Sequence, residues 1–163
     1  MKHPKRINAM AGMVIVVLLV LCAIFANWIA PYDINMQDPS NRFAYPSLSH
    51  PLGTDNYGRD ILSRIIYGGR ISLLVSVSAV AMALIVGGFI GALAAYIGGF
   101  FENVVMRLFD IIMAIPSFLL AVTVQAALGT GVQNAAIAIA IGTMPTMARI
   151  MRSAVLTVKG QEF

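Results

Sequence analysis

Two carboxylates with a histidine nearby are the first candidates for chemistry. Asp55 and Asp60 are five positions apart, and His50 precedes them. Carboxylate and imidazole groups can together bind a divalent metal. Arginines accompany both carboxylates, however, so ion pairing is the preferred interpretation. We therefore expect neither a metal site nor a cofactor.

A second charged pair, Arg107 and Asp110, lies one helical turn apart beside a long apolar stretch. Charges within such a stretch usually face protein or water and are paired. A proton relay through Asp110 is one interpretation, and a structural salt bridge is the preferred one. Pro116 removes a backbone donor and predicts a bend. Gln125 could line a pathway or bond to a neighbouring helix, and both remain open.

Signatures of common enzymes are absent from the sequence. It has no Gly-x-x-x-x-Gly-Lys-Ser/Thr phosphate loop, no Gly-x-Ser-x-Gly elbow and no His-Glu-x-x-His zinc pair. Asp110 also has no second carboxylate within the apolar stretches with which to share a proton. We expect no catalysis by this chain, so any energy source must come from another one.

Long apolar stretches must position these residues. The chain is 59% hydrophobic and 11% charged, against about a quarter charged in an average soluble domain. Residues 7–32, 71–101 and 111–148 contain no Asp, Glu, Lys or Arg, and about 20 helical residues cross a bilayer. Glycines and amides at 128–134 divide the third stretch. The sequence thus predicts four spans, at about residues 7–29, 71–97, 104–128 and 132–150.

Charge placement predicts how these spans are oriented. The net charge of +4 fits membrane orientation better than nucleic-acid binding, because no basic patch accompanies it. Basic residues at both ends favour a cytoplasmic N-terminus, although the arginines of the loop at 31–70 oppose this. A signal peptide is less consistent, since the first run is too long and lacks an Ala-x-Ala site. Cys22, the single cysteine, lies within that run.

The segment before the second span predicts a short helix of its own. Asp60 is placed to cap a helix that begins at Ile61 and to pair with Arg64 four residues on. The helix has an apolar side, so we expect it to lie at the outer membrane interface until Gly68 and Gly69 turn the chain into the span.

The second span carries a strip of small side chains at spacings of three or four: Ser72, Ser76, Ala79, Ala83, Gly87, Gly91 and Ala95. Small residues allow close backbone approach, which is a main source of packing energy in lipid. We predict an interior helix, against the alternative that Gly and Ala are simply common in membrane helices. In the fourth span, Gly142 and Pro145 weaken the backbone, as a hinge or as a kink.

Four segments, at 25–33, 50–73, 96–121 and 147–163, closely resemble one family of membrane proteins. The most specific is the run LGTDxxGRDxxSR, whose fixed residues are Leu52, Gly53, Thr54, Asp55, Gly58, Arg59, Asp60, Ser63 and Arg64. The family is that of dipeptide, oligopeptide and nickel permeases of binding-protein-dependent ABC importers, and specifically the C-type permease subunit.

This resemblance implies an all-α membrane protein with the type I importer permease (MetI-like) fold, in which a full subunit has six helices. It implies multiple crossings of the cytoplasmic (inner) membrane and import of di- or oligopeptides. The implied partners are a second related permease, two cytoplasmic ATPases and an extracytoplasmic substrate-binding protein. Nickel or a nickel chelate is the alternative substrate, and a non-transporting membrane anchor or assembly protein is the alternative from another class.

The expected organisation has three parts. Residues 1–30 form a cytoplasmic stub and the first transmembrane helix, 31–70 form the extracytoplasmic loop, and 71–163 begin the transmembrane permease core. The last residues, Gly160, Gln161, Glu162 and Phe163, resemble the lead-in to the loop that couples family members to their ATPases. The chain is thus expected to be an N-terminal fragment that stops before this loop.

Overall fold

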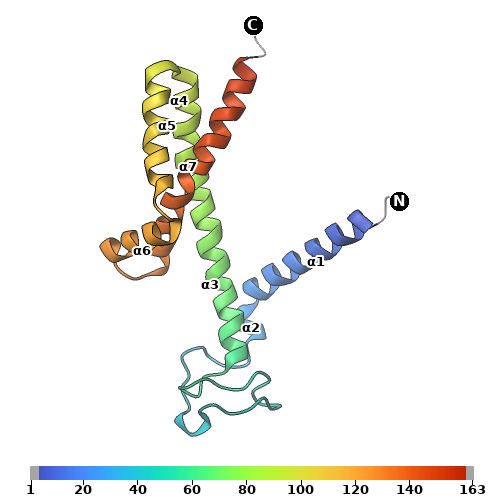
Figure 1. Cartoon of the computed structure of the whole chain (residues 1–163). Helices are drawn as coiled ribbons and strands as arrows, with labels where there is room; N and C mark the ends of the chain where they lie inside the picture. Colours follow the sequence, from blue (N-terminus) through green and yellow to red (C-terminus); the bar gives the residue numbers. More distant parts are fainter. Residues whose placement is uncertain (1–3, 161–163) are drawn as a thin grey trace. The chain divides into compact units, whose positions relative to one another are not determined.

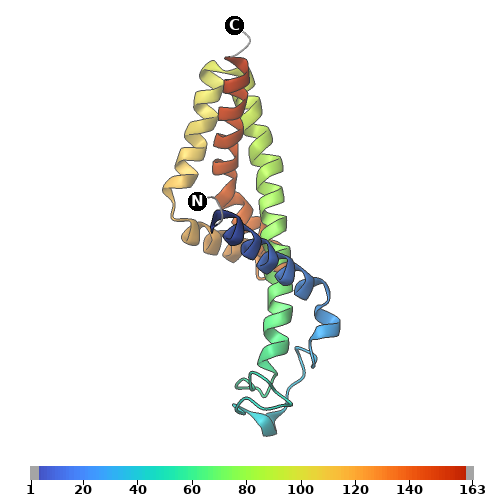
Figure 2. The same cartoon turned by 90° about the vertical axis from the view of Figure 1, so that its right-hand side faces the viewer.

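The computed structural model describes residues 4–160, with side chains from Asn8 onward, and this part of the chain contains helices and no strand. Figure 1 and Figure 2 follow its course. The chain divides into two compact units, Met1–Leu74 and Val75–Phe163. The predicted all-α class is confirmed for the described residues.

The first unit opens with α1 (Pro4–Ile24) and the short α2 (Ala26–Ile29), followed by an irregular loop that holds a 3₁₀ turn, η1 (Pro39–Asn41). Nearly every large apolar side chain of α1 from Met10 to Ile24 is exposed, on all sides of the helix. A helix that is apolar all round needs lipid or other protein around it.

The helix α3 (Ile61–Met82) begins where the sequence predicted a helix to begin, but it does not end at Gly68 and Gly69. The expected turn at these two glycines is wrong. Neither has a positive φ, and a side chain at either would meet open space. No neighbouring group among the described residues offers the backbone other hydrogen-bond partners at these glycines. The helix therefore continues through both residues.

One helical run of the described residues, Ile61–Ile97, is long and apolar enough to cross a membrane. It consists of α3, a π-helical segment η2 (Ala83–Gly87) and α4 (Gly88–Ile97). The pair α5 and α6 would add a second span if it counts as one, and the apolar part of α1, Asn8–Ile24, is shorter. The four predicted spans therefore stay a prediction.

Pro116 divides the predicted third span into two helices, α5 (Gly99–Ala114) and α6 (Ser117–Leu128), which meet at a bend of 92°. Proline has no N–H to donate, and it disfavours a helical conformation in the residue before it. Ile115 accordingly takes an extended conformation, with φ −83° and ψ 126°. The predicted bend at Pro116 is confirmed.

The turn predicted at 128–134 is confirmed, and α7 (Val132–Lys159) follows it. Asn134 Nδ2 donates hydrogen bonds to the carbonyl oxygens of Leu128 (2.9 Å) and Gly129 (3.0 Å) and so closes the turn. The helix contains Pro145 and runs past the predicted end at 150 to Lys159. The choice between hinge and kink at Pro145 stays open.

The strip of small residues is the main packing surface of the second unit. Ala79 and Ala83 are fully buried against Ala136 and Ala140 of α7. Further along, Gly87 faces the Met144 backbone. Because Gly87 places no side-chain bulk between η2 and α7 there, their backbones lie in contact.

The same surface continues to the end of α4. Gly91 lies against the Ala148 backbone and Ala95 is fully buried, whereas Ser72 and Ser76 at the other end of the strip are exposed. The predicted packing face is thus confirmed from Ala79 to Ala95.

Candidate functional site

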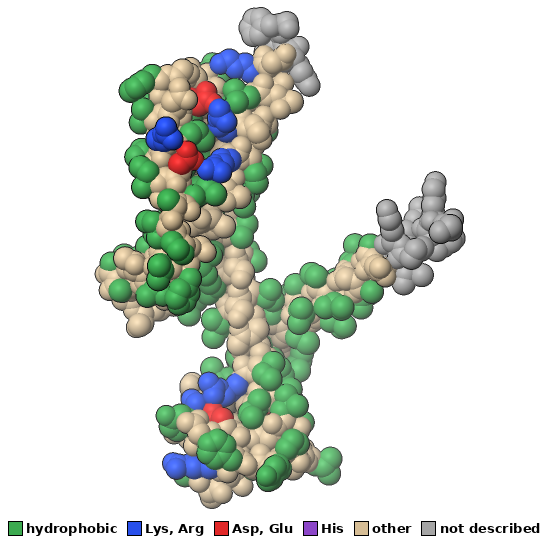
Figure 3. Space-filling view, in the orientation of Figure 1, with side chains coloured by type: hydrophobic (Ala, Val, Ile, Leu, Met, Phe, Trp, Pro, Cys, Tyr) green, Lys and Arg blue, Asp and Glu red, His purple; other side chains and the backbone are tan. Residues whose placement is uncertain are grey.

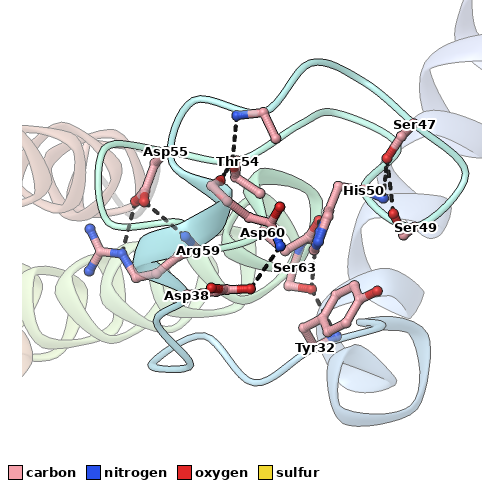
Figure 4. A network of polar contacts seen from close by, with 12 residues as sticks. Tyr32, Asp38, Ser47, Ser49, His50, Thr54, Asp55, Arg59, Asp60 and Ser63 are labelled. Carbon is pink, nitrogen blue, oxygen red and sulfur yellow. Dashed lines mark hydrogen bonds and ion pairs between the residues drawn. The ribbon is translucent and has the colours of Figure 1, made fainter.

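The family-like run from Leu52 to Arg64 forms a tight, hydrogen-bonded turn in the first unit (Figure 4). Thr54 and Asp60 form an isolated antiparallel bridge across it. Gly53 and Gly58 have φ of 75° and 74°, a conformation that side chains rarely adopt. A Cβ at Gly53 would overlap the Ala44 carbonyl oxygen. Glycine is required at both positions by backbone geometry and close approach.

Asp55 lies at the centre of this turn and organises it. Its Oδ1 accepts hydrogen bonds from the backbone amides of Tyr57 (2.8 Å) and Arg59 (3.0 Å). Its Oδ2 pairs with Arg59 Nε at 2.8 Å and with Arg64 Nη1. Burial raises the pKa of Asp55, but these hydrogen bonds and the Arg59 charge outweigh it and lower the pKa to about 2.

Asp60 joins three parts of the loop and is itself buried. Its Oδ2 accepts hydrogen bonds from the Ser63 amide and hydroxyl, both at 2.8 Å, so it caps α3 as predicted. Its Oδ1 lies 3.0 Å from His50 Nδ1. Burial raises the pKa of Asp60. The hydrogen bonds from Ser63 and His50 lower it by more, so the pKa of Asp60 is lowered overall.

The same network ties the loop back to the end of α2. Ser63 is completely buried, and its Oγ accepts a hydrogen bond of 3.1 Å from the Tyr32 amide. The Tyr32 ring stacks on His50, with 4.8 Å between ring centroids. Asp60, His50, Ser63 and Tyr32 thus hold both ends of the loop together.

Arg64 differs from the prediction, because it pairs with Asp55 and not with Asp60. Both oxygens of Asp60 are already engaged, by Ser63 and His50. Sequence spacing suggested the i,i+4 pair, but the turn brings Asp55 to the same side of α3 as the Arg64 guanidinium. The role of His50 as a partner of Asp60 was also missed, since only the closed loop brings residues ten apart together.

The remaining members of the run hold a preceding segment of the loop. Thr54 Oγ1 accepts a hydrogen bond of 2.8 Å from the Ala44 amide and donates one to the Asn41 carbonyl oxygen. Gly58 lies so close to Asp38 that a Cβ would overlap its carbonyl oxygen. Leu52 and Tyr57 are the exposed large apolar residues of the run. The run therefore fixes the conformation of residues 38–44 as well as its own.

In the second unit, acidic and basic side chains gather on α5 and α7 (Figure 3). Asp110 Oδ1 lies 2.6 Å from Arg149 Nη2, and Glu102 Oε1 lies 2.5 Å from Arg152 Nε. The predicted pair of Arg107 with Asp110 is wrong, since no ion pair of Arg107 occurs among the described residues. Both salt bridges join helices distant in sequence, which spacing within one helix does not reveal.

The two other predicted site residues lie at opposite ends of α6. Pro116 precedes α6, and Gln125 is half-buried near its end. A shallow cavity of about 370 Å³ between α6 and α7 is lined by other residues, among them Ser117, Phe118 and Thr143. The choice left open for Gln125 stays open. Gly160 follows α7, whereas Gln161, Glu162 and Phe163 lie outside the described residues.

Two protein-family models match this chain, one in the first unit and one in the second. Residues 5–50 match the model of the N-terminal TM domain of oligopeptide transport permease C. Residues 87–163 match that of the binding-protein-dependent transport system inner membrane component. The chain belongs to the family of binding-protein-dependent transport permeases. Within that family the first match identifies the C-type permease.

Curated members of the family align over almost the whole chain. The dipeptide transport system permease protein DppC of Alkalihalophilus pseudofirmus is 44% identical over 98% of this chain and 52% of its own length. The di/tripeptide permease DppC of Pseudomonas aeruginosa is 42% identical over 96% and 54%. The glutathione permease GsiD of Escherichia coli O6:K15:H31 is 44% identical over 95% and 52%. The chain spans about half the length of these relatives.

Proposed function

We propose that this chain is part of the C-type permease subunit of an ATP-binding-cassette importer that carries di- or oligopeptides across the cytoplasmic membrane. It provides no catalysis. The partners in this proposal are a second related permease, two cytoplasmic ATPases and an extracytoplasmic binding protein. The observation that carries the proposal is the alignment of nearly the whole chain with permeases named for dipeptide, tripeptide and glutathione transport.

The second unit supports the transport role on physical grounds. A transporter that alternates access must move helices as rigid bodies about a fixed site. The backbone contacts between α4 and α7 and the two salt bridges between α5 and α7 would keep these helices together as one such body. The bend at Pro116 sets α6 apart from α5, which gives a place where relative movement could occur.

The membrane arrangement in the proposal has four crossings with a cytoplasmic N-terminus, within a MetI-like subunit of six helices. Residues 1–30 supply the stub and first crossing, and 31–70 the extracytoplasmic loop. Residues 71–163 supply the three other crossings, made by α3 with α4, by the bent pair α5 and α6, and by α7. The Gly160 to Phe163 segment would lead toward the ATPase contact.

Uptake measurements test the proposal. Cells that carry the complete permease gene and its partner genes are compared with cells in which the ATPases carry a Lys→Ala change in the phosphate loop. We expect import of labelled di- and tripeptides that falls to background without ATP hydrolysis. Labelled nickel, measured in the same cells, distinguishes the alternative substrate. Full-rate peptide uptake with the inactive ATPases would contradict the importer.

A packing variant separates transporter from passive anchor. Gly142→Leu places a bulky side chain in α7, where Leu120 of α6 is the nearest neighbour. An importer should lose uptake when α6 and α7 are forced apart, while an anchor or assembly protein would leave uptake intact. Membrane levels of the variant, measured by immunoblot, show that it is present.

A further inference from the structure

Helical geometry is interrupted at three places in the second unit. The path from α3 to α4 passes through the π-helical turn of η2, α5 is separated from α6 at Pro116, and α7 contains Pro145. A π-helical segment replaces hydrogen bonds between residues four apart by bonds between residues five apart, and a proline removes one such bond. Each place therefore resists bending less than the regular helix on either side of it.

These three interruptions lie at one level of the unit. A Cβ at Gly87, the last residue of η2, would lie 2.5 Å from the Met144 carbonyl oxygen, and Met144 directly precedes the proline of α7. Ser117, directly after the bend between α5 and α6, lines the shallow cavity together with Thr143 of α7. Because all three paths are irregular at the same level, the parts on either side can move as two groups.

The part of α7 just before Pro145 is weakened further and has space beside it. Pro145 has no N–H for the carbonyl oxygen of Ile141, four residues earlier. Thr143 Oγ1 donates a hydrogen bond to the Ile139 carbonyl oxygen, an interaction that often bends helices. Gly142 places no side chain in the cavity of about 370 Å³ that it helps to line. Thus α7 has room to bend here toward α6.

On one side of this level, α4, α5 and residues 146–159 of α7 are held together. The backbones of Gly91 and Ala148 are in contact. The two salt bridges between α5 and α7 both involve this part of α7, and Lys159 Nζ donates a hydrogen bond of 3.2 Å to the Tyr96 carbonyl oxygen of α4. Figure 1 and Figure 2 show these three segments side by side. We call this group the α4–α5 body.

On the other side, residues 132–141 of α7 are held to α6 and to the end of α3. Ala136 and Ala140 pack against Ala79 of α3, and the Asn134 side chain closes the turn from α6. We call this group the α6 body. Among the described residues no salt bridge joins the α6 body to the α4–α5 body, so bending between them does not have to break one.

We infer that this level is a hinge, at which the α6 body bends relative to the α4–α5 body during the transport cycle. The contact between Gly87 and Met144 is the pivot, and bending of α7 toward α6 closes the cavity beside Thr143. This inference rests on the proposed function, because transport supplies the alternation between two conformations. It assigns Pro145 to a hinge and not to a fixed kink.

Distances between spin labels in the complete permease complex in nanodiscs test the hinge, with Cys22→Ser and the other cysteines of the complex replaced. Leu128→Cys and Val158→Cys place one label at an exposed position in each body. From Pro145 to position 158, α7 is a lever of about 20 Å, so a bend of about 15° moves its end by about 5 Å. The 128–158 distance should change by about that much between the resting complex and the complex trapped with ATP and vanadate. Phe100→Cys with Val158→Cys, both in the α4–α5 body, should keep its distance.

Two variants of α7 show whether the irregular segment causes the movement. Pro145→Ala restores a donor for the Ile141 carbonyl oxygen, so it should abolish most of the 128–158 distance change and lower peptide uptake at least about fivefold. Thr143→Ala removes the side-chain bond and should act in the same direction, more weakly. Thr123→Ala is the matched control, because it removes the same kind of bond, from Thr123 Oγ1 to the Leu119 carbonyl oxygen (2.8 Å), within regular α6. It should leave the distance change as in wild type.

Three results would overturn the hinge and leave the proposed function intact. The first is an equal 128–158 distance in both states while ATP-driven uptake continues. The second is a 100–158 distance that changes as much as the 128–158 distance. The third is a distance change of wild-type size in both Pro145→Ala and Thr143→Ala, with both proteins at normal membrane levels. A wild-type complex that does not import peptide would instead overturn the proposed function, and the role of the hinge with it.

Discussion

Hydrogen bonds to single carboxylates control the conformation of the loop. Asp55 accepts two backbone amides and pairs with two arginines, and Asp60 joins the histidine, the serine and the start of α3. Neither arrangement leaves a carboxylate oxygen directed at a substrate. The role of these residues is therefore structural: they fix the conformation of the loop.

The lowered pKa of Asp55 makes the loop sensitive to acid. Its pKa is about 2 in the folded loop and 3.8 when unperturbed, so the ionised form favours the folded loop. That stabilisation is complete above about pH 5 and is lost as the pH falls through 3.8 toward 2, by about 1–2 kcal/mol. Amide exchange of residues 53–60, corrected for intrinsic rates, should show falling protection across this interval.

Asp55→Asn is the control for this prediction. It removes the titrating group, so protection should be weaker at neutral pH and should change less between pH 4 and pH 2. The remaining change would come from Asp38 and Asp60, whose pKa values are also lowered. Equal protection of the wild-type loop at pH 5 and pH 2 would contradict the assignment of Asp55 as the organising carboxylate.

Two glycines of the first unit should respond oppositely to alanine. At Gly58 the φ of 74° and the nearby Asp38 carbonyl oxygen leave no room for a Cβ, so Gly58→Ala should destabilise the loop by about 1–3 kcal/mol. Gly68 is helical with open space around it, so Gly68→Ala should be neutral or stabilising. Proteolysis of the loop in detergent measures both, and a neutral Gly58→Ala would refute the close approach.

Among the helices and turns, the features predicted correctly from the sequence are those that arise from residues at the same position in the chain. The cap by Asp60, the bend at Pro116 and the turn after Leu128 arise from the residues at those positions, and all three are confirmed. The strip of small residues from Ala79 to Ala95 could also be predicted, because helical periodicity places residues three or four apart on the same face of a helix.

The errors have a shared physical origin as well. Arg107 and Arg64 were assigned to the nearest carboxylate in sequence, but Asp110 pairs with Arg149 and Arg64 pairs with Asp55. Ion pairs form between side chains that the tertiary structure brings together. The spacing of residues within one helix does not reveal these partners. Gly68 and Gly69 permit a turn without requiring one, and the helix continues because no neighbouring group replaces its hydrogen bonds.

Packing between α4 and α7 should be sensitive to a single methyl group. A Cβ at Gly91 would overlap the Ala148 carbonyl oxygen and lie 2.6 Å from its Cα, and backbone cannot yield as a flexible side chain does. Gly91→Ala should cost about 1–3 kcal/mol and lower the thermal midpoint in detergent. Gly142→Ala is the matched control, because only the Leu120 side chain approaches, at 3.9 Å. Equal midpoints for the two variants would contradict the backbone contact.

For the whole molecule, the bent pair α5 and α6 decides how the chain crosses the membrane. A break of 92° is compatible with a broken span or with a re-entrant loop. Between the loop at 31–70 and the end of α7, the run Ile61–Ile97 and α7 account for two proposed crossings. If α5 and α6 add a third, positions 48 and 159 lie on opposite sides. If they re-enter, the two positions lie on the same side.

Cysteine labelling distinguishes these arrangements, because Cys22 is the single native cysteine and can be replaced by serine. Leu48→Cys and Lys159→Cys are introduced separately into the complete permease and treated with a membrane-impermeant maleimide in intact cells lacking an outer membrane barrier. We expect labelling at 48 from outside, and at 159 only after permeabilisation. Ala140→Cys, at a buried position, should stay unlabelled in both conditions. External labelling at both 48 and 159 would make the bent pair a re-entrant loop, with three crossings in this chain instead of four.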